Sequence, residues 1–134
     1  MLAKLIEAVP NIDPKVRIIG GFSNGAHAID GPLSKPEFTA AFSAFILIEG
    51  GGSPGGAYKG ANHKPIYFAW GEQSPIAASS PIVIGRAKSG KMKLRTHEMK
   101  ATGHQFPKTE KAIVKSWIYD TVLPDLRRVP GSTR

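Results

Sequence analysis

One stretch of the sequence passes from an apolar strand straight into a candidate helix, and it runs Ile18-Ile19-Gly20-Gly21-Phe22-Ser23-Asn24-Gly25-Ala26-His27. Residues 21–25 match the pattern G-x-S-x-G, in which a serine occupies a sharp strand-to-helix turn. The residues two before and two after the serine must lack bulk for this turn to close, which explains the two glycines. The stretch therefore predicts an α/β fold with Ser23 as a candidate nucleophile, although the five residues alone also fit a plain glycine-rich turn.

The chain on either side alternates between apolar runs of strand length and segments with helical spacing. Strands are expected at residues 16–19, 44–48, 65–70 and 92–97. Helices are expected at residues 1–8, 24–33, 36–42 and 82–88, and from Thr109 onward, where an amphipathic stripe runs through Ala112, Ile113, Trp117, Ile118 and Val122. This order predicts a three-layer α/β fold with a mostly parallel four-stranded sheet.

Length and composition point to one ordinary domain. The chain has 134 residues, which suits a single domain. We expect residues 1–126 to form that domain and the basic residues 127–134 to fray as a tail. There is no cysteine, which excludes disulfides, thiolate metal sites and cysteine nucleophiles. No run of the roughly 18 apolar residues that span a membrane is present, and no export signal is recognisable, so the cytoplasm is the default expectation for location.

The charge balance is basic, with 18 Lys and Arg against 10 Asp and Glu and a formal net charge of +8. The basic residues are scattered and do not follow one helical face, so a solvated basic surface is the favoured interpretation. Binding of nucleic acid or another polyanion is a minor alternative. The acidic residues are too dispersed to indicate a metal cluster, and we expect neither a metal nor a cofactor.

A serine hydroxyl is a weak nucleophile until a base takes its proton, so the pattern requires a histidine after a later strand. His104 lies in a loop between the last expected strand and the helix that starts at Thr109, and it is the candidate base. His27 follows Ser23 by one helical turn and is expected to point away from the hydroxyl, while His63 and His97 are assigned to structure or surface. The N–H of Asn24 begins the helix and is the candidate donor to a developing oxyanion.

These residues together resemble the α/β-hydrolase family, in particular its esterase and dienelactone-hydrolase-like members. The resemblance is carried by residues 18–27, by Ile66-Tyr67-Phe68-Ala69-Trp70-Gly71-Glu72, by Gly103-His104 and by the helix through Trp117. It covers almost the whole chain but only the C-terminal half of the family's domain. The resemblance implies that the preceding half would include the strand and loop that usually supply a second oxyanion-binding N–H.

The acid of the expected catalytic triad is the main departure from the family pattern. The resemblance places the acid in the loop after the third strand, where the sequence has Ser74 in place of the usual Asp. Glu72 lies two residues earlier in that loop and is the first candidate to replace it. Glu49 ends the preceding strand, a position that some family members are thought to use, and is the second candidate. The alternative to both glutamates is that no acid is present, which would leave a slower Ser-His pair.

Three functions follow from these observations. The leading hypothesis is a carboxylic-ester hydrolase that forms an acyl-enzyme on Ser23 with His104 as base, acting on a small ester or acyl substrate and needing no cofactor. The second is a catalytically inactive piece of the same fold that serves as a structural or interaction module. The third is polyanion binding. The strand at residues 16–19 would have an unpaired edge, which predicts a homodimer through that edge or a chain that is part of a longer product.

Overall fold

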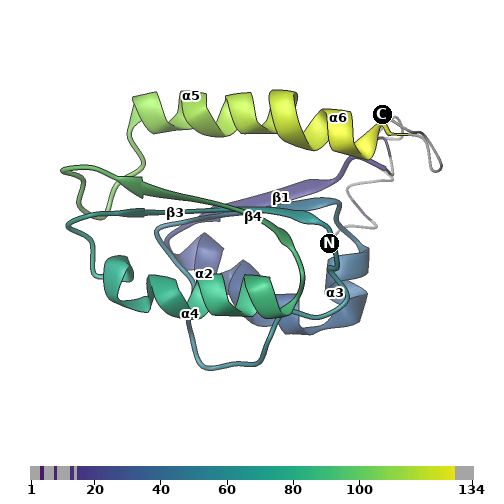
Figure 1. Cartoon of the computed structure of the whole chain (residues 1–134), viewed down its shortest axis with the longest axis horizontal. Coiled ribbons are helices and arrows are strands. Elements are labelled where there is room, and N and C mark those ends of the chain that lie inside the picture. The colour runs from purple at the N-terminus through teal and green to yellow at the C-terminus, as the bar shows by residue number, and fades with distance from the viewer. Residues whose placement is uncertain (1–3, 5–7, 9–12, 14, 129–134) are drawn as a thin grey trace.

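The computed structural model describes residues 4, 8, 13 and 15–128, and the structural statements below concern those residues. The helix expected at residues 1–8 lies almost entirely outside this part of the chain, as does most of the expected tail at 127–134. Four strands form one sheet in which every pairing is parallel, in the order β1 (Ile18–Phe22), β2 (Ala44–Ile48), β3 (Pro65–Gly71) and β4 (Lys93–Met99). The expected α/β class and four-stranded sheet are confirmed (Figure 1).

Helices cover both faces of this sheet (Figure 1). One face carries α2 (Asn24–Asp30), the short 3-10 turn η1 (Gly31–Ser34), α3 (Pro36–Ala40) and α4 (Ile76–Ser89). The other carries α5 (Lys108–Trp117), the π-helical turn η2 (Ile118–Val122) and α6 (Leu123–Leu126). When parallel strands follow one another in sheet order and their crossovers have one handedness, the helices of those crossovers lie on one face. The helices after β4 join no further described strand and cover the opposite face.

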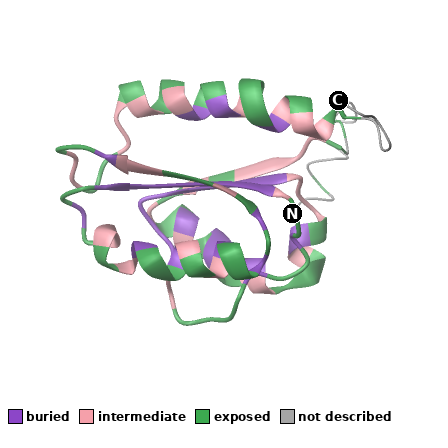
Figure 2. Cartoon of the chain, viewed as in Figure 1, coloured by how far each residue is buried: buried purple, intermediate pink, exposed green. Residues whose placement is uncertain are grey.

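The two central strands, β2 and β3, are buried along their whole length (Figure 2). Successive side chains of a strand point to opposite faces, so these strands feed two separate cores. The core under α2 and α4 includes Phe45, Leu47, Ile66 and Phe68. The core under α5 includes Ile46, Ile48, Tyr67, Trp117 and Val122. An apolar run without polar alternation, as at residues 44–48, is what burial on both faces requires.

The helix expected at residues 82–88 is longer in the structure, where α4 begins at Ile76. The shorter prediction was wrong because Pro81 normally breaks a helix, since it has no N–H to donate to the carbonyl four residues earlier. Here that carbonyl, on Ala77, accepts a hydrogen bond from the Ser80 hydroxyl at 2.9 Å instead. A neighbouring side chain thus replaces the lost backbone donor, and the helix continues through the proline.

Candidate active site

Ser23 occupies a strained turn between β1 and α2. Its backbone has φ 55° and ψ −115°, in a region that residues with a side chain rarely adopt. The turn is held by the Ser23 N–H, which donates to the Ile48 carbonyl of the neighbouring strand at 2.9 Å. β1 continues through Gly20, Gly21 and Phe22 up to this point, three residues beyond the expected strand. The residue therefore has the conformation that the G-x-S-x-G pattern predicts.

The two glycines of the pattern have different roles. A Cβ atom placed on Gly21 would lie 2.3 Å from the carbonyl carbon of Gly25, so position 21 must be glycine for the turn to close. A Cβ atom on Gly25 would meet no heavy atom within 4 Å. The expectation that both positions must lack bulk therefore holds at Gly21 and is wrong at Gly25. The tight contact is between the first position and the backbone of the second.

The parallel sheet brings a carboxylate beside this serine. Phe22 is in register with Ile48, so the residues that follow β1 and β2, Ser23 and Glu49, leave the sheet at the same edge. Glu49 also has a positive φ, 56°, and its N–H donates to the Ala69 carbonyl at 2.9 Å. Its side chain is fully buried, with 0% exposure. A buried carboxylate needs hydrogen-bond donors, and the N–H of Gly71 at the end of β3 supplies one to Oε1.

His104 completes the arrangement from a loop after β4. Its Nε2 lies 2.8 Å from the Ser23 hydroxyl oxygen, and its Nδ1 lies 2.9 Å from Oε2 of Glu49. Because a carboxylate only accepts, Nδ1 carries the proton, which leaves the Nε2 lone pair to accept from the serine hydroxyl when the ring is neutral. The three side chains thus form one hydrogen-bonded chain from a buried carboxylate to a surface hydroxyl.

Close packing over the end of β3 directs the loop of His104 toward this carboxylate. A Cβ atom on Gly71 would lie 2.3 Å from the Thr102 carbonyl oxygen and 2.4 Å from that of Gly103. The Gln73 N–H holds the loop in place by donating to the Thr102 carbonyl oxygen at 2.9 Å. Gly71 therefore lets the loop cross over β3 and also donates to the carboxylate. Sequence reasoning missed this double role, although a glycine at the end of a buried strand is a recognisable signal of close backbone approach.

Glu72, the first candidate for the acid, does not contact His104. Its Oε2 accepts from the Ala101 N–H at 2.8 Å and its Oε1 lies 3.5 Å from Lys100 Nζ, at a side-chain exposure of 43%. The structure therefore corrects the expected order of the two candidates, since the buried Glu49 is the partner of the imidazole. Ser74, at the family's usual acid position, is buried, and its hydroxyl accepts from the Ile76 N–H at 3.2 Å. The Ser74 hydroxyl therefore bonds to the first residue of α4.

The remaining histidines lie away from the serine hydroxyl. His27 Nδ1 accepts from the Gly51 N–H at 3.1 Å and lies 3.1 Å from the Ser53 hydroxyl, so it supports the loop that follows Glu49. His97 pairs with Glu110 of α5 at 2.6 Å. Asn24, the candidate oxyanion donor, is the first residue of α2, and the first N–H groups of a helix have no acceptor within it. Its N–H therefore has no acceptor within α2.

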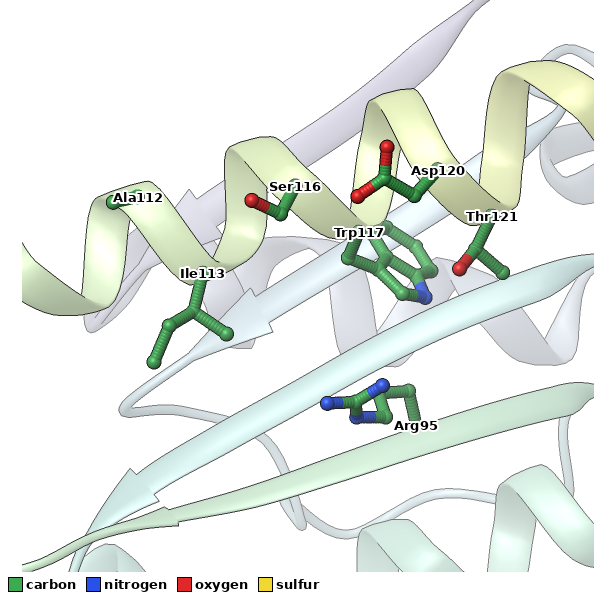
Figure 3. Close-up of a pocket in the computed structure, with 7 residues that line it drawn as sticks. All are labelled: Arg95, Ala112, Ile113, Ser116, Trp117, Asp120 and Thr121. Atoms are coloured by element: carbon green, nitrogen blue, oxygen red, sulfur yellow. The ribbon is translucent and has the colours of Figure 1, made fainter.

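Cavities flank the α5 face of the sheet, and two of them bear on the site. One of about 380 Å³ lies between β4 and α5 and contains none of the three hydrogen-bonded residues; it is lined by Arg95, Ala112, Ile113, Ser116, Trp117, Asp120 and Thr121 (Figure 3). The other, of about 270 Å³, lies beside β1 and includes Phe22; it is otherwise lined by Gly20, Gly21, Ile46, Ile48, Phe106 and Val114. Phe22, the residue that precedes Ser23, thus lines this second cavity.

The described residues contain no cluster of three or more His, Asp or Glu side chains placed to hold a metal ion. Within the same part of the chain, no helix has the length and apolar character to cross a membrane. The end of β1 brings together a hydroxyl, an imidazole and a buried carboxylate in sequence.

Solved structures share this architecture. The Bacillus cereus carboxylesterase matches with a TM-score of 0.73 and 22% identity over 90% of this chain and 56% of its own. YahD with malic acid matches with a TM-score of 0.70 and 18% identity over 90% of this chain and 58% of its own. A variant of Arabidopsis thaliana SOBER1 matches with a TM-score of 0.69 and 17% identity over 89% of this chain and 61% of its own. No family model matches the sequence, and no curated protein does.

These likenesses establish the fold. The chain has the architecture of the α/β hydrolases, as the resemblance of its sequence implied, and it spans less than two thirds of each of these structures. Within the described residues, this chain carries the strained turn at Ser23, Glu49 directly after β2, and the loop of His104. A hydrolase-like fold and a hydrogen-bonded Ser-His-Glu chain are thus present in the same molecule.

Proposed function

We propose that the chain carries the catalytic centre of a serine hydrolase that cleaves carboxylic esters through an acyl-enzyme on Ser23. The observation that carries this proposal is the continuous hydrogen bonding from Ser23 through His104 to Glu49. The strained turn at Ser23 also supports this proposal, because strained backbone is held in place by the surrounding structure and is concentrated at functional sites.

In the proposed reaction the Ser23 oxygen attacks the acyl carbon while its proton passes to Nε2 of His104. The carbonyl π-electrons move onto oxygen, and the N–H of Asn24 stabilises the resulting oxyanion. When this tetrahedral intermediate collapses, the C–O bond to the alcohol breaks and His104 returns the proton to the departing oxygen. A water molecule then attacks the acyl-enzyme with the same proton transfers and releases the carboxylic acid and the free serine.

Glu49 supports both half-reactions without being protonated itself. Its buried Oε2 keeps the proton on Nδ1 of His104, so that Nε2 is the basic nitrogen when the serine attacks. Its negative charge then stabilises the imidazolium that forms. Glu49 remains in place during these changes because Gly71 donates to its other oxygen.

A fluorophosphonate probe tests this proposal, since it labels serines that a base has activated. We expect labelling of the folded chain, loss of labelling in Ser23→Ala, and unchanged labelling in the control Ser89→Ala, which alters an exposed serine at the end of α4. Hydrolysis of a short-chain aryl ester should follow the same pattern. A folded chain that neither reacts with the probe nor hydrolyses the ester would favour the alternative, a catalytically inactive module of the hydrolase fold.

We also propose that the free edge of β1 pairs with a second copy of the chain. Among the described residues β1 has one strand partner, β2, so its other edge presents unpaired backbone groups. Gly20 and Phe22 are exposed there, and no charged side chain of β1 protects the edge. An unprotected edge of this kind favours pairing with another polypeptide.

A further inference from the structure

The imidazole of His104 is held by hydrogen bonds at only two atoms. Its nitrogens contact Ser23 and Glu49, which together fix the line through Nδ1 and Nε2. The bond that joins the ring to its backbone lies in the same plane as these two hydrogen bonds, so none of the three contacts a face of the ring or directly opposes rocking out of that plane. The backbone of the His104 loop packs over β3, but the side chain is 43% exposed.

A ring that rocks loses the geometry that proton transfer requires. The Nε2 lone pair lies in the plane of the imidazole, and a hydrogen bond weakens as its donor leaves that direction. The general base must face the hydroxyl oxygen with this lone pair when the proton moves. A further contact, on the face of the ring, would oppose that rocking.

Phe22 supplies that contact. Its ring centroid lies 5.4 Å from that of His104, with 36° between the two planes. Phe22 is 41% exposed, one of the few large apolar side chains in the described chain that remain so open. Burial in the core therefore does not account for its position, and the imidazole is the aromatic ring that it contacts.

The place of Phe22 in the sheet couples it to the other two contacts. It precedes Ser23 in the chain, and its register partner Ile48 precedes Glu49. The three groups that touch the imidazole thus come from the ends of two paired strands, β1 and β2. Any shift of these two strands moves Phe22, Ser23 and Glu49 together, so their positions around the imidazole are kept.

We propose that Phe22 is a positioning residue that holds the imidazole plane of His104 in line with the Ser23 hydroxyl. The kinetic part of this inference rests on the proposed function. The structural part, the order of the imidazole, does not depend on it.

Three substitutions separate a flat aromatic face from mere bulk. Phe22→Ala removes the contact, Phe22→Leu keeps apolar volume without a flat face, and Phe22→Tyr keeps the face. Tyr119→Ala is the matched control, because it removes an exposed aromatic ring, 61% exposed, from η2 on another part of the surface. Circular dichroism and thermal unfolding of each variant report whether the chain is folded, and Phe22→Leu remains informative if Phe22→Ala does not fold.

The kinetic readout is the ester hydrolysis described above. We expect kcat in Phe22→Ala and Phe22→Leu to fall by about 10- to 100-fold with KM nearly unchanged, as small misplacements of a catalytic group do. Phe22→Tyr should restore kcat to within about twofold of the original, and Tyr119→Ala should leave it unchanged. An unchanged kcat in the folded Phe22→Leu variant would overturn the inference, as would a Phe22→Tyr variant as slow as Phe22→Ala.

The structural readout is the NMR resonance of the His104 Nδ1 proton in chain labelled with 15N. We expect this resonance to be visible in the original chain and in Phe22→Tyr, and to be lost through exchange with water in Phe22→Ala and Phe22→Leu. If the original chain shows no hydrolysis, the proposed function fails while this measurement still decides the role of Phe22. A resonance that persists unchanged in Phe22→Leu would overturn the positioning role itself.

Discussion

Replacing the buried acid is the sharpest perturbation of the proposed centre. In Glu49→Gln the shape is conserved, and the amide oxygen can still accept from the Gly71 N–H. The amide nitrogen, however, would face Nδ1 of His104, where two donors would oppose each other. The imidazole relieves this conflict by moving its proton to Nε2. The nitrogen that should accept from Ser23 is then a donor, and the serine loses its base.

The expected loss follows from this change of tautomer. An acid-to-amide change in a Ser-His-Asp centre lowers kcat by about 10⁴, which corresponds to about 5 kcal/mol of transition-state stabilisation. The cost in folding is smaller, on the order of 1–2 kcal/mol, because a buried hydrogen bond to a charged acceptor becomes a neutral one. Activity should therefore fall far more than the free energy of unfolding, and the variant should remain folded.

Glu72→Gln is the matched control, because Glu72 was the first candidate to replace the family's acid and the structure places it away from His104. It contacts the Ala101 N–H and Lys100 at a largely exposed position, so its removal should change activity by less than about twofold. The assay is steady-state hydrolysis of a short-chain aryl ester, with the rate of fluorophosphonate labelling as a second measure. The assignment of the acid would be refuted if Glu72→Gln abolished activity while Glu49→Gln stayed within about tenfold of the original.

Other consequences of the structure can be tested in parallel. Gly71→Ala should abolish probe labelling, because its added carbon would lie 2.3 Å from the Thr102 carbonyl oxygen and displace the loop of His104; a labelled Gly71→Ala chain would contradict this account. Tyr58→Phe should lower the free energy of unfolding in urea by about 1–3 kcal/mol, since Asp30 loses the hydrogen bond that it accepts from this buried phenol at 2.5 Å. Burial and the bond to Asp30 raise the pKa of Tyr58, so the folded chain keeps a proton that the unfolded chain loses, and stability should fall as the pH rises above about 10. Tyr58→Phe should remove that part of the pH dependence. Light scattering after size exclusion should give the mass of a dimer if the edge of β1 pairs with a second copy, and a monodisperse monomer would argue against it.

The local features of this protein could be predicted from its sequence. The apolar run at residues 44–48 predicted a strand buried on both faces because only such a strand can omit polar alternation. The G-x-S-x-G pattern predicted the turn at Ser23 because the clash that makes Gly21 obligatory involves a residue only four positions away. His104 could be placed because parallel strands bring their carboxyl ends to one edge, so a histidine after the last strand returns toward the first.

Two features were beyond such reasoning. The length of α4 depended on whether the Ser80 hydroxyl would replace the donor that Pro81 lacks, a choice of side-chain rotamer within the folded helix. The choice between Glu72 and Glu49 depended on where the loop after β4 crosses the sheet. Both glutamates follow strands at the same edge, and nothing in their local sequence ranks them.

The sequence by itself thus determined which strands form, where the chain turns at Ser23 and which histidine lies beside it, because these follow from steric and periodic constraints. The tertiary structure alone decided which glutamate contacts His104. Gly71 lets the loop of His104 pass close over β3, which brings Nδ1 to 2.9 Å from Glu49. A hydrogen bond is made or lost within a few tenths of an ångström, and that distance is set by the packing of segments 55 residues apart in the chain.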